Sequence, residues 1–308
     1  MNKQKLNNTV ILLTVFIIAE LFCVKEFALS AKRISEDFFI TLEVSKDNPY
    51  EREANYLTLT LHSKIPDIAY ANVIESPYVE SGNFNYINRI DVSSRGRKEI
   101  IDGEEYFSFP LQTYVFTFHD KGNYTLSGGT FEVGINMPVV YDDPFWGRTR
   151  GVETSNVKLV SDKKKIKVRK LPTPIKEENF CDVVGDFEIA TVVPPGDIII
   201  NEPCTAIITV KGKGLLGNDV LPEYAEAFHD EVKLKSMSEN RKMYFDGKDI
   251  VSELQLECDF IPQSADAKIG AVKIVYFNPE TGKYETAVSD PVDVKVKSIT
   301  SKIQTIDI

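Results

Sequence analysis

The residue types that most often carry out catalysis are few in this chain and do not cluster along it. The three histidines are His62, His119 and His229, and none lies three or four positions from another histidine or a cysteine. Metal ligands normally recur at such short spacings. We therefore expect no metal site built from these residues.

Signatures of enzymes are also missing from the sequence. It contains no Gly-x-Ser-x-Gly elbow, no phosphate-binding glycine loop and no dinucleotide fingerprint. The glycines Gly128 and Gly129 are better explained as a turn between strands. A pair of carboxylates could meet in space as in a glycosidase, but no pair stands out from a solvated surface. We expect no enzymatic activity, no catalytic residue and no cofactor.

Of four cysteines, Cys23 lies near the N-terminus and Cys181, Cys204 and Cys258 lie in the second half. An oxidising compartment would permit one disulfide and leave one thiol. Cys204 and Cys258 fall on the apolar faces of expected strands, where we favour a role as small core hydrophobes. The disulfide stays open as an alternative because it depends on a Cα separation. Without a Cys-x-x-Cys pair, redox catalysis has no support.

The stretch most suggestive of function is Asp142–Arg148, which contains the only tryptophan of the chain. It lies in an insertion at 136–153 that is rich in Pro, Asp, Gly and aromatic residues. Exposed aromatic side chains often mark binding sites. We predict a partner-binding site at Phe145, Trp146 and Arg148. In the alternative, Trp146 folds back and covers the end of its own domain.

The elements that must position this stretch are strands. Alternation of apolar and polar residues with a period of two occurs at 114–118 and again at 254–260, and each stretch is followed by a turn. A basic, valine-rich strand closes each copy, at 166–168 and at 292–296. This pattern predicts two half-buried antiparallel units. Tyrosine and phenylalanine are abundant and methionine is scarce, which fits pleated sheets better than helix bundles.

One motif makes the fold more specific. Asp120, Gly122 and Tyr124 match the D-x-G-x-Y pattern of a tyrosine corner, in which the tyrosine hydroxyl binds the backbone of its own loop. The alternative is an ordinary glycine turn. The second copy has Lys268-Ile269-Gly270 in place of the tyrosine. We predict an all-β chain with tandem immunoglobulin-like β-sandwich domains after an N-terminal signal or anchor segment.

The expected organisation follows from these elements and from the prolines. The Leu171-Pro172-Thr173-Pro174 stretch favours an extended spacer between the domains. We expect a signal peptide or anchor at 1–30, a first domain at 36–170, a linker at 171–179, a second domain at 180–298 and a tail at 299–308. A short helical turn is expected within 221–232, and a tight hairpin at 277–284.

The N-terminal segment predicts export. Lys3 and Lys5 precede an apolar core at 9–19, and Ala28-Leu29-Ser30 is a plausible cleavage site. We favour cleavage, and retention as a membrane anchor is the alternative. Glu20, Leu21 and Phe22 are poor residues for lipidation at Cys23.

The balance of charges argues against one class of partner. The chain has 36 basic and 46 acidic residues, which give a net charge of −10. Such a chain is repelled by phosphate backbones. We therefore expect no nucleic acid as a partner.

Several further segments occur in a characteristic order along the chain. They are Tyr114–Phe118, Lys121–Leu126, Asp142–Phe145, Thr154–Val157, Leu171–Pro174, Val184–Phe187, Asn201–Pro203 and Phe277–Tyr284. In this order the chain resembles the BatD family of aerotolerance-associated envelope proteins from Bacteroides-type bacteria. The resemblance spans nearly the whole chain after residue 30. Members usually continue into a C-terminal membrane helix, so this chain looks like a short form that ends at Ile308 without one.

The resemblance implies a non-enzymatic, membrane-associated scaffold in the periplasm or cell envelope, with no catalytic residues. Anchoring in the inner membrane through the N-terminal segment stays open as an alternative. It also implies partners, namely von Willebrand A-domain Bat proteins and a MoxR-type ATPase system, in a complex linked to aerotolerance or envelope stress. The alternative function is an exported adhesin or carbohydrate-binding protein that uses Trp146 as a stacking platform.

Overall fold

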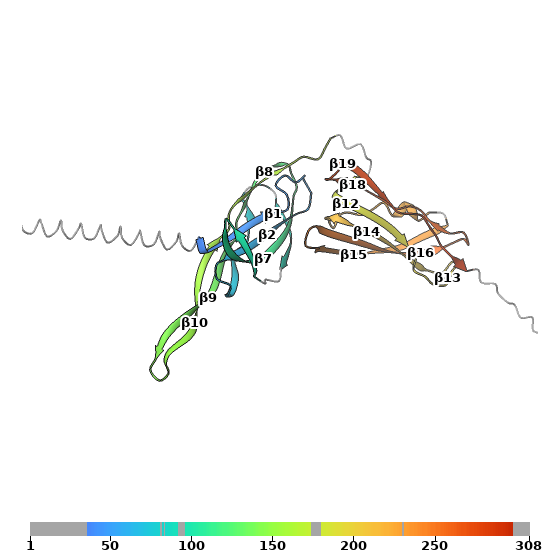
Figure 1. Ribbon diagram of the computed structural model, residues 1–308. Coiled ribbons are helices and arrows are strands. Elements are labelled where there is room, and N and C mark those ends of the chain that lie inside the picture. The colour runs from blue at the N-terminus through green and yellow to red at the C-terminus, as the bar shows by residue number, and fades with distance from the viewer. Residues whose placement is uncertain are drawn as a thin grey trace, which may run out of the picture.

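The computed structural model describes residues 36–80, 82, 84–91, 96–173, 180–229 and 231–297. The expected signal or anchor segment at 1–30 and the tail at 299–308 lie outside the described residues. In the part described, the chain is built almost entirely of strands, so the all-β prediction is confirmed (Figure 1). No helix among these residues has the length and apolar composition needed to span a bilayer.

The first half of the chain forms a five-stranded sheet and two three-stranded sheets. The larger sheet has the order β1-β2-β7-β5, with β6 also paired to β7, and the smaller ones have the orders β10-β9-β3 and β11-β8-β4. The strands are β1 (Phe38–Val44), β2 (Asn55–Ser63), β3 (Ile68–Glu75), β4 (Tyr78–Val79), β5 (Phe84–Asp91), β6 (Arg97–Ile101), β7 (Glu104–Phe118), β8 (Gly122–Ser127), β9 (Thr130–Asp143), β10 (Gly147–Val160) and β11 (Lys164–Val168).

The core of this half lies between side chains from the large sheet and side chains from β8, β9 and β11. Leu57, Leu59 and Leu61 of β2 alternate with less buried residues, so all three point into the core. Burial of one such leucine contributes roughly 2 kcal/mol. The half-buried pattern expected for the end of β7 is wrong, because Val115 and Thr117 are buried as well. That end of β7 is covered on both faces.

The second half forms a six-stranded sheet in the order β15-β16-β14-β12-β18-β19, with two small ladders, β13-β21 and β17-β20, beside it. Its elements are β12 (Phe180–Val192), β13 (Ile198–Ile199), β14 (Cys204–Gly214), the 3-10 helix η1 (Ala225–Ala227), β15 (Val232–Phe245), β16 (Ile250–Pro262), β17 (Lys268–Ile269), β18 (Lys273–Asn278), β19 (Lys283–Val288), β20 (Val292–Asp293) and β21 (Val296–Lys297). The short helix confirms the turn expected at 221–232. The closing strand expected at 292–296 is instead split into two short pieces.

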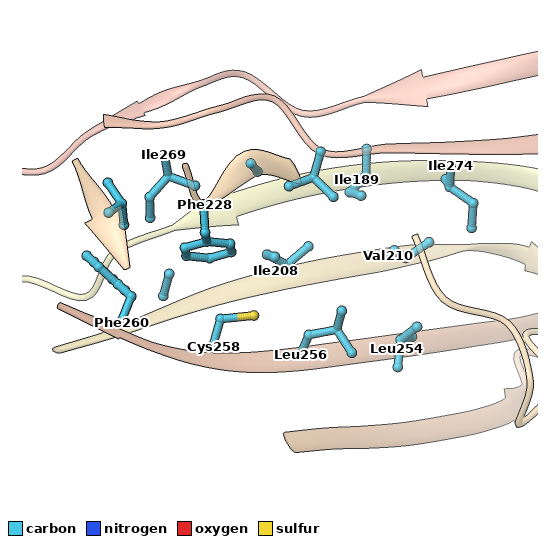
Figure 2. Packing of buried hydrophobic residues seen from close by; sticks show 14 of the residues in the cluster. Ile189, Ile208, Val210, Phe228, Leu254, Leu256, Cys258, Phe260, Ile269 and Ile274 are labelled. Atoms are coloured by element: carbon cyan, nitrogen blue, oxygen red, sulfur yellow. The ribbon is translucent and has the colours of Figure 1, made fainter. Parts of the chain in front are cut away.

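In this half the alternation at 254–260 is confirmed. Leu254, Leu256, Cys258 and Phe260 are fully buried and face one way (Figure 2). The sulfur of Cys258 lies in this row beneath Ile208 of β14. Cys204 and Cys258 form no disulfide, which supports the role of the buried Cys258 as a small core hydrophobe.

A third, smaller core joins the two halves. Leu171, Val184 and Phe277 are buried in it, and Tyr50, Phe180 and Tyr284 pack around them. The ring of Tyr50, from the first half, lies 4.8 Å from the ring of Phe277, from the second. Leu171, the first residue of the expected linker, is only 4% exposed. Residues 174–179 of that linker lie outside the described residues.

Polar contacts surround this junction. The Leu171 N–H donates to the Glu51 carboxylate at 3.0 Å, and the Tyr284 hydroxyl donates to the Pro172 carbonyl at 3.1 Å. Arg52 forms an ion pair with Asp182 across the junction. A ring contact between Tyr56 and Phe245, 4.7 Å apart, adds a second point of attachment. The two halves are therefore packed against each other at two places.

Candidate functional site

The predicted insertion at 136–153 is an extended β-hairpin rather than a loop. β9 and β10 pair without interruption from Thr130↔Val160 to Asp143↔Gly147. β3 pairs with β9 only as far as Ile135. From Met137 outward the hairpin therefore continues as a two-stranded ribbon, and Figure 1 shows it extending away from the rest of the molecule. We call residues 137–153 the arm.

The sequence favours this ribbon because apolar and β-branched residues continue past the body of the domain. The core face of β9, which carries Val133 and Ile135, continues into Met137, Val139 and Tyr141 by alternation. The ring of Tyr141 lies across the strand over Gly151, where a Cβ atom would be 2.7 Å from the ring. An aromatic ring that covers a glycine in this way stabilises a ribbon that lacks other support.

A three-residue turn closes the arm and presents the predicted site residues. Gly147 has a φ of +70°, which matches the left-handed residue that ends such turns. The turn holds Pro144, Phe145 and Trp146, and the two aromatic side chains are 92% and 86% exposed. The alternative in which Trp146 folds back over its own domain is therefore wrong.

Charged residues flank the aromatic pair. Arg148 lies opposite Asp142 across the hairpin, and Arg150 lies opposite Val140. The structure thus brings Phe145, Trp146 and Arg148 together at the end of the arm. Large apolar side chains are exposed along the rest of it as well, namely Met137, Val140, Tyr141 and Val152. The alternation of residues with a period of two within β9 and β10 is the sequence signal that could have predicted these exposed apolar residues.

The predicted tyrosine corner is present. The Tyr124 hydroxyl donates to the Asp120 carbonyl at 2.9 Å. Its ring packs 4.5 Å from the ring of Phe118, and the backbone of Gly82 passes so close that a Cβ there would lie 1.8 Å from the Tyr124 ring. Tyr124 thus ties the turn after β7 to the core.

His62 takes part in a polar network whose arrangement differs from a catalytic one. Its Nδ1 lies 2.8 Å from the Ser108 hydroxyl and its Nε2 lies 2.9 Å from the Thr41 hydroxyl, while Ser108 donates to Glu99. In a hydrolytic triad the carboxylate binds the histidine and the serine donates to that histidine. Here the Glu99 carboxylate accepts the hydrogen bond that the Ser108 hydroxyl donates, so this hydroxyl does not donate to His62 as it would in a triad.

Burial decides the ionisation of several groups. It lowers the pKa of His62, although Glu99 and Glu43 act in the opposite direction. It raises the pKa of Cys258 to about 11, with Asp259 as a second cause, and the same two causes raise the pKa of Cys204 to about 11. Both thiols are therefore protonated and unreactive at neutral pH.

Side chains that could bind a metal do not cluster in the part of the chain that the structure describes. Among the described residues, no three histidine, cysteine, aspartate or glutamate side chains come together as a possible metal site. His119 and His229 are exposed and lie in different halves of the chain.

These features define an all-β protein with an exposed arm. No family model matches the sequence, and no curated protein matches it. Among solved structures, the chain is similar to the full-length major pilin SpaD from Corynebacterium diphtheriae, at 12% identity and a TM-score of 0.24 over 62% of this chain and 51% of that chain. It is also similar to the adhesin InvE from Yersinia pseudotuberculosis, at 13% identity and a TM-score of 0.18 over 83% of this chain and 59% of that chain. The chain therefore spans less than two thirds of either protein, and likeness at this level carries no argument about function.

Proposed function

We propose that this chain is a non-enzymatic interaction protein whose arm docks onto another protein. The observation that carries the proposal is the exposure of Phe145 and Trp146 at the end of a regular two-stranded ribbon. Large apolar side chains in water are unfavourable, so their place at the far end of an extended hairpin suggests a surface kept for a partner.

The composition of the arm supports a protein partner. Tryptophan, tyrosine and arginine are the residue types that most often dominate binding energy at protein interfaces. Trp146, Tyr141, Arg148 and Arg150 all lie on the arm. Aromatic side chains lose little conformational entropy on binding because they have few rotatable bonds.

The resemblance in sequence order to the BatD family suggests where this takes place and with what. We propose the periplasm or cell envelope as the location. On the same grounds, we propose Bat-type von Willebrand A-domain proteins, working with a MoxR-type ATPase, as the partners.

Affinity capture from envelope fractions tests the proposal. The wild-type chain should retain a von Willebrand A-domain protein. The double variant Phe145→Ala, Trp146→Ala should retain about tenfold less of that protein. Ile100→Ala is the matched control, because Ile100 is 76% exposed beside the turn of a different hairpin. Equal retention by wild type and the double variant, or no such protein in the wild-type sample, would contradict the proposal.

A second candidate is an exported carbohydrate-binding protein or adhesin. The exposed ring of Trp146 favours it, since an indole face is large and its edge carries an N–H donor. Glycan-array binding that disappears in Trp146→Ala but survives in Ile100→Ala would support this candidate. No glycan bound by the wild type would count against it.

A further inference from the structure

The outer edge of β10 is an unpaired sheet edge in the described part of the chain. Only β9 pairs with β10, so one edge of this 14-residue strand has no pairing partner among the described strands. Its register with β9 has no bulge over 14 pairs. Exposed edges that are long and regular tend to pair with other strands.

Two other edges of the molecule, those of β15 and β9, carry features that block pairing. The edge strand β15 has a register shift between Leu234 and Ser236, and it carries Lys233, Lys235 and Lys242. On the other side of the arm, the edge of β9 contains Pro138. Bulges, lysines and prolines are the usual means of blocking such edges. Between Gly147 and Val157, β10 contains no proline, lysine or bulge.

Pro138 also fixes which backbone groups face outward on β10. A proline has no N–H, so within a ladder its nitrogen normally faces away from the paired strand. Residues opposite each other in such a non-hydrogen-bonded pair both turn their N–H and C=O groups away from each other. Val152 lies opposite Pro138. Its N–H and C=O therefore face outward at the unprotected edge.

We propose that a second copy of this chain pairs with that edge, β10 antiparallel to β10, with Val152 opposite Val152 of the other copy. This inference rests on the proposed role of the arm in association, and it names one partner. The two valines would exchange both backbone hydrogen bonds across a twofold axis. Pro138 and Val152 of each copy would form one apolar row over four strands, which covers Val152, now 66% exposed.

Charge disfavours the registers that are shifted from Val152 toward the body of the domain. With Val152 at the centre, Arg148 faces Asn156, Arg150 faces Thr154 and Gly151 faces Glu153, so no like charges are opposed. Shifting the centre to Glu153 sets that carboxylate against itself and Arg148 against Lys158. Centring on Thr154 sets Arg150 against Lys158. Like charges directly opposite each other on a sheet are destabilising.

Disulfide trapping in the full chain tests this pairing. Paired strands place opposite Cα atoms about 5.5 Å apart, within the range of a disulfide. Under mild oxidation, Val152→Cys should give a much higher yield of covalent dimer than the wild type. The yield from the wild type shows how much dimer the native cysteines form by themselves. Val160→Cys is the matched control, because it lies on the same strand, is 65% exposed and would not face its own copy. Equal dimer yield from both variants would overturn the proposal.

Analytical ultracentrifugation supplies the second measurement. An interface of this size is small, so the wild type should dimerise with increasing concentration rather than at all concentrations. Val152→Lys sets two ammonium groups opposite each other and should remain monomeric with unchanged circular dichroism. A wild type that stays monomeric throughout, or a Val152→Lys variant that still dimerises, would overturn the proposal.

The same samples separate this inference from the proposed docking function. Residues 144–146 lie outside the paired stretch, so the variant Phe145→Ala, Trp146→Ala should keep its dimer while it loses the captured partner. Val152→Lys should lose the dimer and keep Phe145 and Trp146 exposed for capture.

Discussion

Tyr124 shows how a single side chain orders a turn in this protein. Its hydroxyl binds the carbonyl of Asp120, and its ring is enclosed by Phe118 and the backbone of Gly82. The ring supplies apolar burial, and the hydroxyl fixes the path of the chain from β7 into β8. The two contributions can be separated by experiment.

Tyr124→Phe should lower the free energy of unfolding by about 1 kcal/mol, since it removes one hydrogen bond and keeps the ring. Urea denaturation measures this loss. Tyr70→Phe removes an exposed hydrogen bond to Asn156 and should cost less. A Tyr124→Phe variant as stable as wild type would show that the ring alone holds the turn.

His62 should make stability depend on pH. Burial holds its pKa below the ordinary 6.5, so the folded protein binds this proton less readily than the unfolded chain does. As the pH falls below that ordinary value, the unfolded state takes up more protons and the folded state loses stability. Each unit of pKa difference corresponds to about 1.4 kcal/mol.

His62→Gln should therefore lose less stability than wild type between neutral pH and about pH 5. Urea denaturation at a series of pH values measures the two slopes. Parallel slopes would mean that His62 titrates in the folded protein as it does in the unfolded chain.

At the scale of elements, the sequence predicts a strand or turn correctly where neighbouring residues alone determine its conformation. The tyrosine corner follows from Asp120–Tyr124, and the hairpin at 277–284 is confirmed, with Gly282 at a φ of +68°. The turn between β6 and β7 was missed, although Asp102 and Gly103 have the positive φ values of a two-residue hairpin turn. The Asp-Gly pair was a signal available in the sequence.

The arm could be predicted only in part. Its aromatic residues were identified as a site, but Pro138, Pro144 and Asp142 are typical of loops and concealed the two strands. Cross-strand contacts decide such a ribbon, and these join residues far apart in sequence, such as Tyr141 with Gly151. The junction of the two halves could not be predicted for the same reason, since Tyr50 and Phe277 meet only in the folded chain.

Cys258 allows a test of the core face of β16. It is fully buried beside Leu256 and Phe260 (Figure 2). Cys258→Ser would bury a hydroxyl in apolar surroundings, so it should be less stable than Cys258→Ala by about 1–2 kcal/mol. Thermal unfolding of both variants measures the difference. Equal stability would indicate a polar environment at this position.

At the scale of the whole molecule, the third core couples the two halves. Phe277 is fully buried against Tyr50 and Tyr284, and Arg52 pairs with Asp182 beside them. That ion pair is exposed and contributes little by itself. We therefore expect the buried aromatic contacts to contribute more to the attachment than this ion pair does.

Phe277→Ala should cost about 3–5 kcal/mol and separate the unfolding of the two halves. Calorimetry should then show two separate transitions for the variant, and the transitions of the wild type should overlap. Because Phe277 also belongs to β18, Tyr50→Ala is the companion variant, since Tyr50 lies outside the named strands. Unchanged cooperativity in both variants would show that the halves are joined elsewhere.

The central claim is that the end of the arm contacts a protein partner. Site-specific photocrosslinking in intact cells tests it most directly, with a photoreactive amino acid placed at Trp146 and, as a control, at Ile100. We predict a discrete crosslinked protein from position 146 and none from position 100. The absence of an adduct at 146, or the same adducts from both positions, would contradict the claim.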